Sequence, residues 1–194
     1  MPNGQARDTI PALVKFLRIV GLCIAAACAY GVAHDQVTVR LCIEYFTIAH
    51  PRLIDSQSPT VLGLFWGVVA TWWVGLGLGV LLGGAARLGR APRLEPRDVR
   101  PEILRVMAGS AAAALLAGVV TFFAARHGYV ALPPAWARQL PEAVHLSFLV
   151  VAAAHSASYA AGFALALVAV ARVVRRRFRL SRPDAPQASS APRR

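Results

Sequence analysis

Residues 60–86 read TVLGLFWGVVATWWVGLGLGVLLGGAA, a run without a single charged side chain. It exceeds the roughly 20 residues that a helix needs to cross the ~30 Å hydrocarbon core of a bilayer. Small residues recur at every fourth position of this run, at Gly63, Gly67, Thr71, Gly75, Gly79 and Gly83. Such spacing lets two helix backbones approach closely, which in lipid is a main source of helix association. The run therefore predicts a membrane-spanning helix packed against another helix, either in this chain or in a second copy.

Three further apolar runs of similar length lie at residues 11–33, 102–125 and 143–174. Hydrophobic residues make up 57% of the 194-residue chain, which is above the proportion found in soluble domains. We expect an all-α fold, a bundle of four transmembrane helices that forms a single membrane domain over residues 1–174. Residues 175–194 are basic and then rich in Pro, Ser and Ala, which predicts a disordered tail.

The fourth run carries its own series of small residues, at Ala154, Ser158, Gly162 and Ala166. Because this series also keeps a four-residue spacing, it is a natural mate for the glycines of the second run. We therefore expect the second and fourth helices to hold the bundle together. The same glycines could instead bind a second copy of the chain or another membrane protein.

The first run could be either a permanent anchor or a cleaved signal peptide. Lys15 and Arg18 lie near its start, and the small residues 25–27 would suit cleavage. We favour an uncleaved anchor, because Tyr30 and Gly31 lead without interruption into a polar segment. Both interpretations place that segment on the same side of the membrane.

The basic residues predict the orientation of the four helices. All but four of the 21 Lys and Arg lie in residues 1–18, 87–105 and 172–194. The four others are Arg40, Arg52, Arg126 and Arg138. Because Lys and Arg accumulate on the cytoplasmic side of membrane proteins, we expect both termini in the cytoplasm. Residues 30–51 would then form a polar loop segment on the outer face.

The same distribution accounts for the net charge of +12, since the basic residues flank the apolar runs. Nucleic acid is not expected as a partner, because aromatic side chains do not alternate with the basic ones as they do in single-strand binders. Arginine supplies 20 of the 21 basic residues, and Ala, Gly and Leu are abundant. This usage is typical of GC-rich bacterial genomes and favours a protein of the bacterial inner membrane, surrounded by the lipid bilayer.

Residues 30–51 hold most of the chemically capable side chains outside the basic segments. From Gln36 to Tyr45 apolar and polar residues alternate, which predicts an extended strand with one apolar face. Residues 129–132 are the one obvious partner for such a strand. A short amphipathic helix over residues 44–49 is the alternative.

The same segment contains the string Tyr-Gly-x-x-His-Asp-Gln-Val-Thr, followed by Glu-Tyr-Phe-Thr. These strings occupy Tyr30, Gly31, residues 34–38 and residues 44–47. In them the chain resembles an uncharacterised family of bacterial four-span integral membrane proteins. The resemblance implies a four-helix membrane fold and carries no activity or ligand.

Three functions are compatible with this segment. The first is structural: a polar network that joins the helices at the outer face, since buried polar groups need partners and such networks specify one packing. Its candidate members are Tyr30, His34, Asp35, Gln36, Thr38, Arg40, Glu44 and Tyr159.

The second function is a site for a divalent metal ion or a proton, with nitrogen and oxygen ligands suited to zinc, iron or copper. The candidate ligands are His34, Asp35, Glu44, His50 and His155. His155 is the strongest of them, because an ionisable group inside a span is costly and suggests a function. It precedes Arg172 by 17 residues, which places it roughly 25 Å from the cytoplasmic boundary. No His pair has HExxH spacing.

The third function is transport, or a role as subunit of a membrane complex, but the spans hold few charges and no repeated half with interrupted helices. No catalytic residue is predicted. Serines lie near His145 and His155, yet the sequence lacks a GxSxG turn and a phosphate-binding glycine loop. We therefore do not expect an enzyme on motif evidence.

Overall fold

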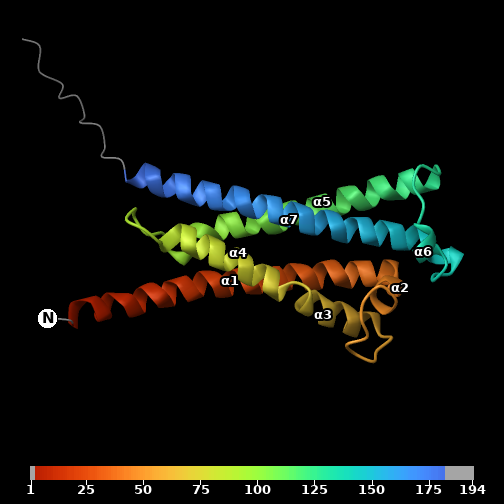
Figure 1. Cartoon of the computed structure of the whole chain (residues 1–194), viewed down its shortest axis with the longest axis horizontal. Helices are drawn as coiled ribbons and strands as arrows, with labels where there is room; N and C mark the ends of the chain where they lie inside the picture. Colours follow the sequence, from red (N-terminus) through yellow and green to blue (C-terminus); the bar gives the residue numbers. More distant parts are fainter. Residues whose placement is uncertain (1–2, 182–194) are drawn as a thin grey trace, which may run out of the picture.

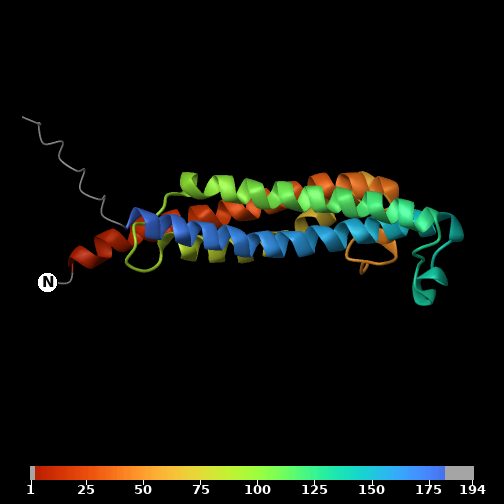
Figure 2. The same ribbon diagram turned by 90° about the horizontal axis from the view of Figure 1, so that it is seen from above.

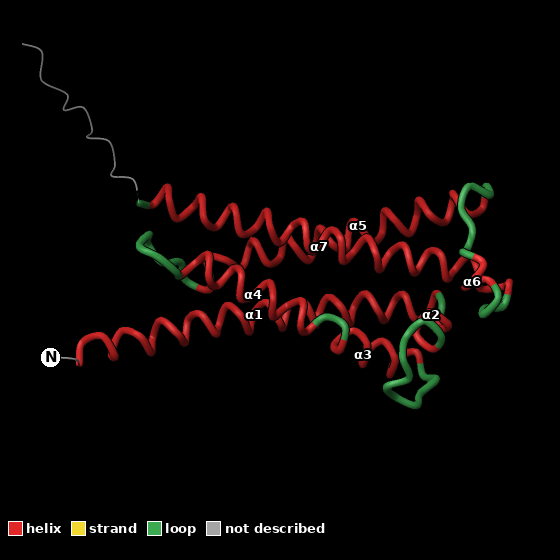
Figure 3. The backbone as a smooth tube through the Cα atoms, viewed as in Figure 1, coloured by secondary structure: helices red, strands yellow, loops and turns green. Residues whose placement is uncertain are grey.

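The structure is a computed structural model, and it describes residues 3–181. These residues form helices and loops, with no strand among them (Figure 3). The elements are α1 (Asn3–Leu41), α2 (Ile43–Thr47), α3 (Pro59–Val69), α4 (Trp72–Arg87), α5 (Pro96–Arg126), α6 (Pro134–Ala137), the 3₁₀ helix η1 (Glu142–Val144) and α7 (His145–Leu180).

Four segments are long and apolar enough to cross a membrane, which confirms the predicted all-α bundle of four spans. They are Ile10–Leu41, Pro59–Arg87, Pro96–Arg126 and Glu142–Leu180. Each helix continues beyond the apolar run that predicted it. The third begins at Pro96 rather than near residue 102. At its start Glu95 and Asp98 form a reciprocal capping box that satisfies backbone N–H groups.

The long helices run side by side along the longest axis of the molecule (Figures 1 and 2). α1 lies along α3 and α4, α5 lies along α7, and contacts of α1 with α5 and of α4 with α7 join the two pairs. The start of α1, the 88–95 connector and the end of α7 gather at one end of the bundle, which we call the basic end. The opposite end carries α2 and α6 and is called the α2–α6 end.

The glycines of the second span contact α1, so their partner helix belongs to the same chain. A Cβ atom at Gly67 would lie 2.5 Å from the Cα of Val32, and one at Gly79 would lie 2.7 Å from the Cα of Val20. Gly63 faces Gln36 in the same way. The expectation that these glycines mate with the fourth helix is therefore wrong. That helix lies along α5 instead, where Gly162 faces Ser110.

The second span is interrupted at its middle, which the uniform glycine spacing did not predict. α3 ends at Val69 and α4 begins at Trp72. Two hydroxyl groups bind carbonyl oxygens next to the break: Thr71 donates to the carbonyl of Gly67, and Tyr159 on α7 donates to that of Ala70 at 3.4 Å. Side chains thus supply partners where the helical ladder is disturbed, as lipid requires.

The predicted strand over Gln36 to Tyr45 is wrong, and the alternative of a short helix is closer to the structure. α1 continues to Leu41, and after a break at Cys42, whose backbone is extended, α2 begins at Ile43. Residues 129–132 form no strand either. The segment on which the family resemblance rests is therefore largely helical rather than a loop.

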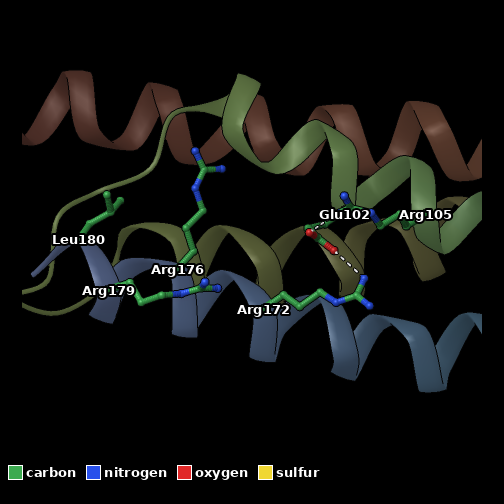
Figure 4. A pocket seen from close by; sticks show the side chains of 6 residues that line it. All are labelled: Glu102, Arg105, Arg172, Arg176, Arg179 and Leu180. Carbon is green, nitrogen blue, oxygen red and sulfur yellow. Dashed lines mark hydrogen bonds and ion pairs between the residues drawn. The ribbon is translucent and has the colours of Figure 1, made fainter.

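Ion pairs and arginine side chains order the basic end. Lys15 donates to Glu95 at 2.7 Å, which lowers the pKa of that carboxyl group. Arg176 pairs with Asp98 at 3.0 Å, while Arg172 reaches Glu102 beside a surface hollow that Figure 4 shows. Since α7 extends through residues 175–180, these are helical and not part of a disordered tail. The rest of the predicted tail, residues 182–194, lies outside the described residues.

Candidate functional site

The site lies between α1 and α7, inside the spans. His34 and Asp35 occupy successive positions on the last third of α1, and His155 lies ten residues into α7. At a rise of 1.5 Å per residue, they lie about 10–15 Å below the α2–α6 end of the bundle. Asp35 is 5% exposed and His155 is 7% exposed. Two ionisable groups are thus enclosed by protein at membrane depth.

The three side chains converge on one point. Each offers a ligand atom, and these atoms all lie within 4.8 Å of one another. His155 Nε2 lies 3.2 Å from Asp35 Oδ1, and the rings of His34 and His155 meet edge to face with their centroids 4.5 Å apart. The structure thus brings together residues that stand 120 positions apart in the sequence.

The hydrogen bonds of His155 define the state of its ring. Its Nδ1 lies 2.9 Å from the carbonyl oxygen of Val151, one turn earlier in α7. Because a carbonyl oxygen only accepts, Nδ1 must carry the hydrogen. In a neutral ring Nε2 then presents a lone pair to the carboxylate of Asp35, which is unfavourable. A hydrogen atom or a metal ion between Nε2 and Oδ1 would remove this repulsion.

His34 provides the third ligand through one of its ring nitrogens. Its Nε2 is buried and has no hydrogen-bond partner among residues 3–181. Leaving such an atom unpaired costs about 1–3 kcal/mol, so this nitrogen is expected to have a partner other than the described residues. Two imidazole nitrogens and one carboxylate are a usual ligand set for zinc and for non-haem iron.

Neighbouring side chains hold the two helices in register around this group. The hydroxyl groups of Tyr30 on α1 and Ser158 on α7 lie 2.7 Å apart and form a hydrogen bond across the interface. Above them, the ring of Tyr45 covers His155 with 4.6 Å between ring centroids. Burial, with the charge of Asp35, raises the pKa of the Tyr45 hydroxyl, which therefore stays neutral.

Two of the five predicted metal ligands lie elsewhere. Glu44 accepts a hydrogen bond from the thiol of Cys42 at 3.4 Å and does not belong to the converging group. His50 bonds the carbonyl of Tyr45 through Nδ1 and rests against the indole of Trp66. Burial lowers the pKa of His50, so this residue is a neutral part of the apolar cover.

The predicted polar network is divided in two by the helix geometry. Gln36 and Arg40 bond each other and Thr60 on α3, on a different side of α1 from the site. Thr38 donates to the carbonyl of His34, which only stabilises its own helix. Tyr159 bonds the interruption of the second span and not His155.

A cavity of about 400 Å³ adjoins the three ligands, and its lining is mostly apolar. Thr71, Ser110 and Ser158 add hydroxyl groups to a wall formed by α1, α4, α5 and α7. Thr71 and Ser110 were not predicted as site residues. A hydroxyl residue within each of two apolar runs was the available signal, but it is common in membrane helices and does not indicate a cavity.

The ligand group and the cavity together are the candidate functional site. No protein-family model, curated protein or solved structure matches this chain. The assignment of a function therefore depends on the geometry of His34, Asp35 and His155.

Proposed function

We propose that this chain is a multi-pass protein of the bacterial inner membrane that binds a divalent transition-metal ion between His34, Asp35 and His155. The observation that carries the proposal is the convergence of the three ligand atoms within 4.8 Å at a buried position. Two ligands of one zinc ion, each about 2.0–2.2 Å from it, lie at most about 4.4 Å apart. Small side-chain rotations therefore bring all three atoms onto one ion.

The state of each ligand supports this proposal. His34 Nε2 has no other partner among the described residues, and His155 Nε2 faces Asp35 with its opposite nitrogen held by Val151. A backbone carbonyl on the second ring nitrogen is the usual way in which proteins orient a metal-binding histidine. Three protein ligands also leave a coordination position open toward the cavity, as in catalytic rather than structural zinc sites.

Zinc content of the purified protein tests the proposal directly. After incubation with zinc sulfate and dialysis in detergent, the wild-type protein is expected to retain about one ion per chain. The His155→Ala and Asp35→Asn variants should lose it. The His127→Ala variant removes an exposed histidine that bonds only its own helix, so it is the matched control and should bind zinc normally.

X-ray absorption of the zinc-loaded wild-type protein provides a measurement that does not depend on the folding of a variant. We expect scattering from two imidazole rings at about 2.0–2.1 Å. A wild-type protein that retains no zinc would contradict the proposal.

The alternative function is the structural polar network, and the bond between Tyr30 and Ser158 favours it, because this bond joins α1 to α7 without any metal. If the wild-type protein binds no metal while Asp35→Asn lowers its melting temperature, the group acts only in helix packing. Buried polar groups that satisfy one another would then account for the site.

The orientation of the bundle in the membrane is a second part of the proposal. Most arginines lie at the basic end, which we therefore place in the cytoplasm with both termini. A membrane-impermeant maleimide added outside the cell is expected to label Asp55→Cys, next to α2, and not Arg93→Cys, in the 88–95 connector. Both positions are exposed, whereas Cys23 and Cys42 are buried and the half-buried Cys28 lies inside a span, so background labelling is low. The reverse labelling pattern would invert the topology.

A further inference from the structure

The cavity beside the ligand group is polar at one end and apolar at the other. His34 and Asp35 line it near the α2–α6 end, whereas Leu78, Leu81 and Val106 line it toward the basic end. Along α7 its lining residues extend from His155 to Ala166, a distance of about 16 Å at 1.5 Å per residue. This distance is close to the depth of one leaflet, half of a hydrocarbon core of about 30 Å.

Two side chains that line the cavity also reach the outer surface of the bundle. Trp73 on α4 and Phe163 on α7 both line it, and they are 57% and 71% exposed on the outside of the bundle. Both residues lie within the spans, where the surroundings of an exposed side chain are hydrocarbon. A ligand can therefore enter from the bilayer without crossing water.

The ligand group indicates the charge of the ligand's head. A divalent ion bound by two neutral imidazoles and the carboxylate of Asp35 keeps one net positive charge. In a site shielded from water a single anionic oxygen group neutralises this charge favourably. The hydroxyl groups of Tyr30 and Ser158 also line the cavity. One of them donates to the other, and the second O–H can donate a hydrogen bond to such a group.

We propose that the cavity binds a long-chain carboxylate taken from the membrane, with its head on the metal ion and its tail toward the middle of the bilayer. The proposal rests on the proposed metal site. A volume of about 400 Å³ is within the usual range of ligand pockets, about 300–1,000 Å³. The polar end of the lining matches the carboxylate head, and the apolar remainder matches a single acyl chain.

Gly77 allows the cavity to be filled without disturbing the fold. It lines the cavity, yet a Cβ atom at this position would meet no other atom within 4 Å. Gly21 on α1 is equally unobstructed and lies away from the cavity. Gly77→Phe therefore places a ring where the tail would lie, and Gly21→Phe is the matched control.

The test is photo-crosslinking of the full-length, zinc-loaded protein with palmitate that carries a diazirine on its tail. The wild-type protein should be labelled on residues of α4 and α7 that line the cavity. Labelling should fall about tenfold in Gly77→Phe, because the added ring occupies the same volume. It should stay unchanged in Gly21→Phe, while all three proteins keep their zinc. A neutral probe, the corresponding photoreactive amide, should label weakly.

The outcomes separate the two proposals. If zinc is bound at one ion per chain but palmitate labels no cavity residue, or labels Gly77→Phe as well as the wild-type protein, the ligand proposal is wrong and the metal site stands. Equal labelling by the amide would overturn the assignment of an anionic head. If the wild-type protein retains no zinc after dialysis, the metal-site proposal is wrong, and the zinc assay shows this independently of the crosslinking.

Discussion

The Gly75→Ala substitution is expected to lower the melting temperature of the protein in detergent by roughly 3–10 °C, whereas Gly77→Ala should leave it unchanged or raise it slightly. A Cβ atom at Gly75 would lie 2.6 Å from the Cα of Ile24 and 2.8 Å from the carbonyl oxygen of Cys23. Both are backbone atoms of α1, so the contact is relieved only if the two helices move apart. Such overpacking costs about 1–3 kcal/mol.

The comparison with Gly77 removes the effect of helix propensity. Both glycines lie inside α4, and alanine favours a helix over glycine by about 1 kcal/mol at either position. At Gly77 nothing lies within 4 Å of the added atom, so the intrinsic gain is all that remains. Thermal unfolding followed by tryptophan fluorescence measures both variants. Equal melting temperatures for the two would show that α1 and α4 do not pack closely through Gly75.

The number of spans could be predicted from sequence because the thickness of a bilayer sets a minimum length for an apolar helix. The partner of each span could not. A stripe of small residues indicates that another helix backbone packs closely against it. It does not indicate which helix, because any helix with a compatible face would fit. The pairing of the second span with α1 is settled by side chains distributed along the whole interface, from Phe16 facing Gly83 on α4 to Gln36 facing Gly63 on α3.

The false strand has a physical explanation. Alternation of apolar and polar residues predicts a strand when one face meets water, but a membrane helix meets lipid on its outer face and protein on its inner face. Val37 and Leu41 are 61% and 55% exposed on the outside of α1, while Val39 is buried against α3. Apolar residues are thus required on both faces, and the period of two arises by coincidence.

The candidate site was predictable one residue at a time. His155 was the strongest candidate because an ionisable group inside a span is costly, and Asp35 was one of two candidate carboxylates, with Glu44. Their contact depends on how α7 lies against α1, which no local spacing encodes. Glu44 and His50 could not be separated from the true members by sequence. In the structure Glu44 contacts the thiol of Cys42, and His50 rests against Trp66.

Replacing Arg177 with alanine is expected to lower the free energy of unfolding by about 3 kcal/mol or more. The guanidinium group is buried at the basic end and donates four hydrogen bonds to backbone carbonyls. The acceptors, at 2.6–2.9 Å, are Ala85, Leu88, Ala91 and Pro92. One side chain thus fixes the end of α4 and the 88–95 connector onto α7. Hydrogen bonds from a charged donor contribute about 1.5–3 kcal/mol each, and their sum is reduced by coupling and by water.

Arg177→Lys should recover only part of this loss, because an ammonium group is a single point with three donors and cannot span four carbonyls as a planar guanidinium does. Arg175→Ala is the matched control. It removes the same charge from an exposed position two residues earlier, so it should change stability by less than about 0.5 kcal/mol. Unfolding monitored by fluorescence at increasing denaturant measures all three variants, and equal losses for Arg175→Ala and Arg177→Ala would contradict a role specific to Arg177.

The same contrast explains why the role of Arg177 could not be predicted from the sequence. Residues 175–177 are three consecutive arginines, and composition assigns them all to one basic tail. A helix turns successive residues by about 100°, so the three side chains leave α7 in different directions. Arg176 reaches Asp98 on α5, and Arg177 enters the bundle beneath the connector. Arginines in one basic run can therefore have different roles. Some orient the helix in the membrane, while Arg177 holds a neighbouring chain segment through four hydrogen bonds.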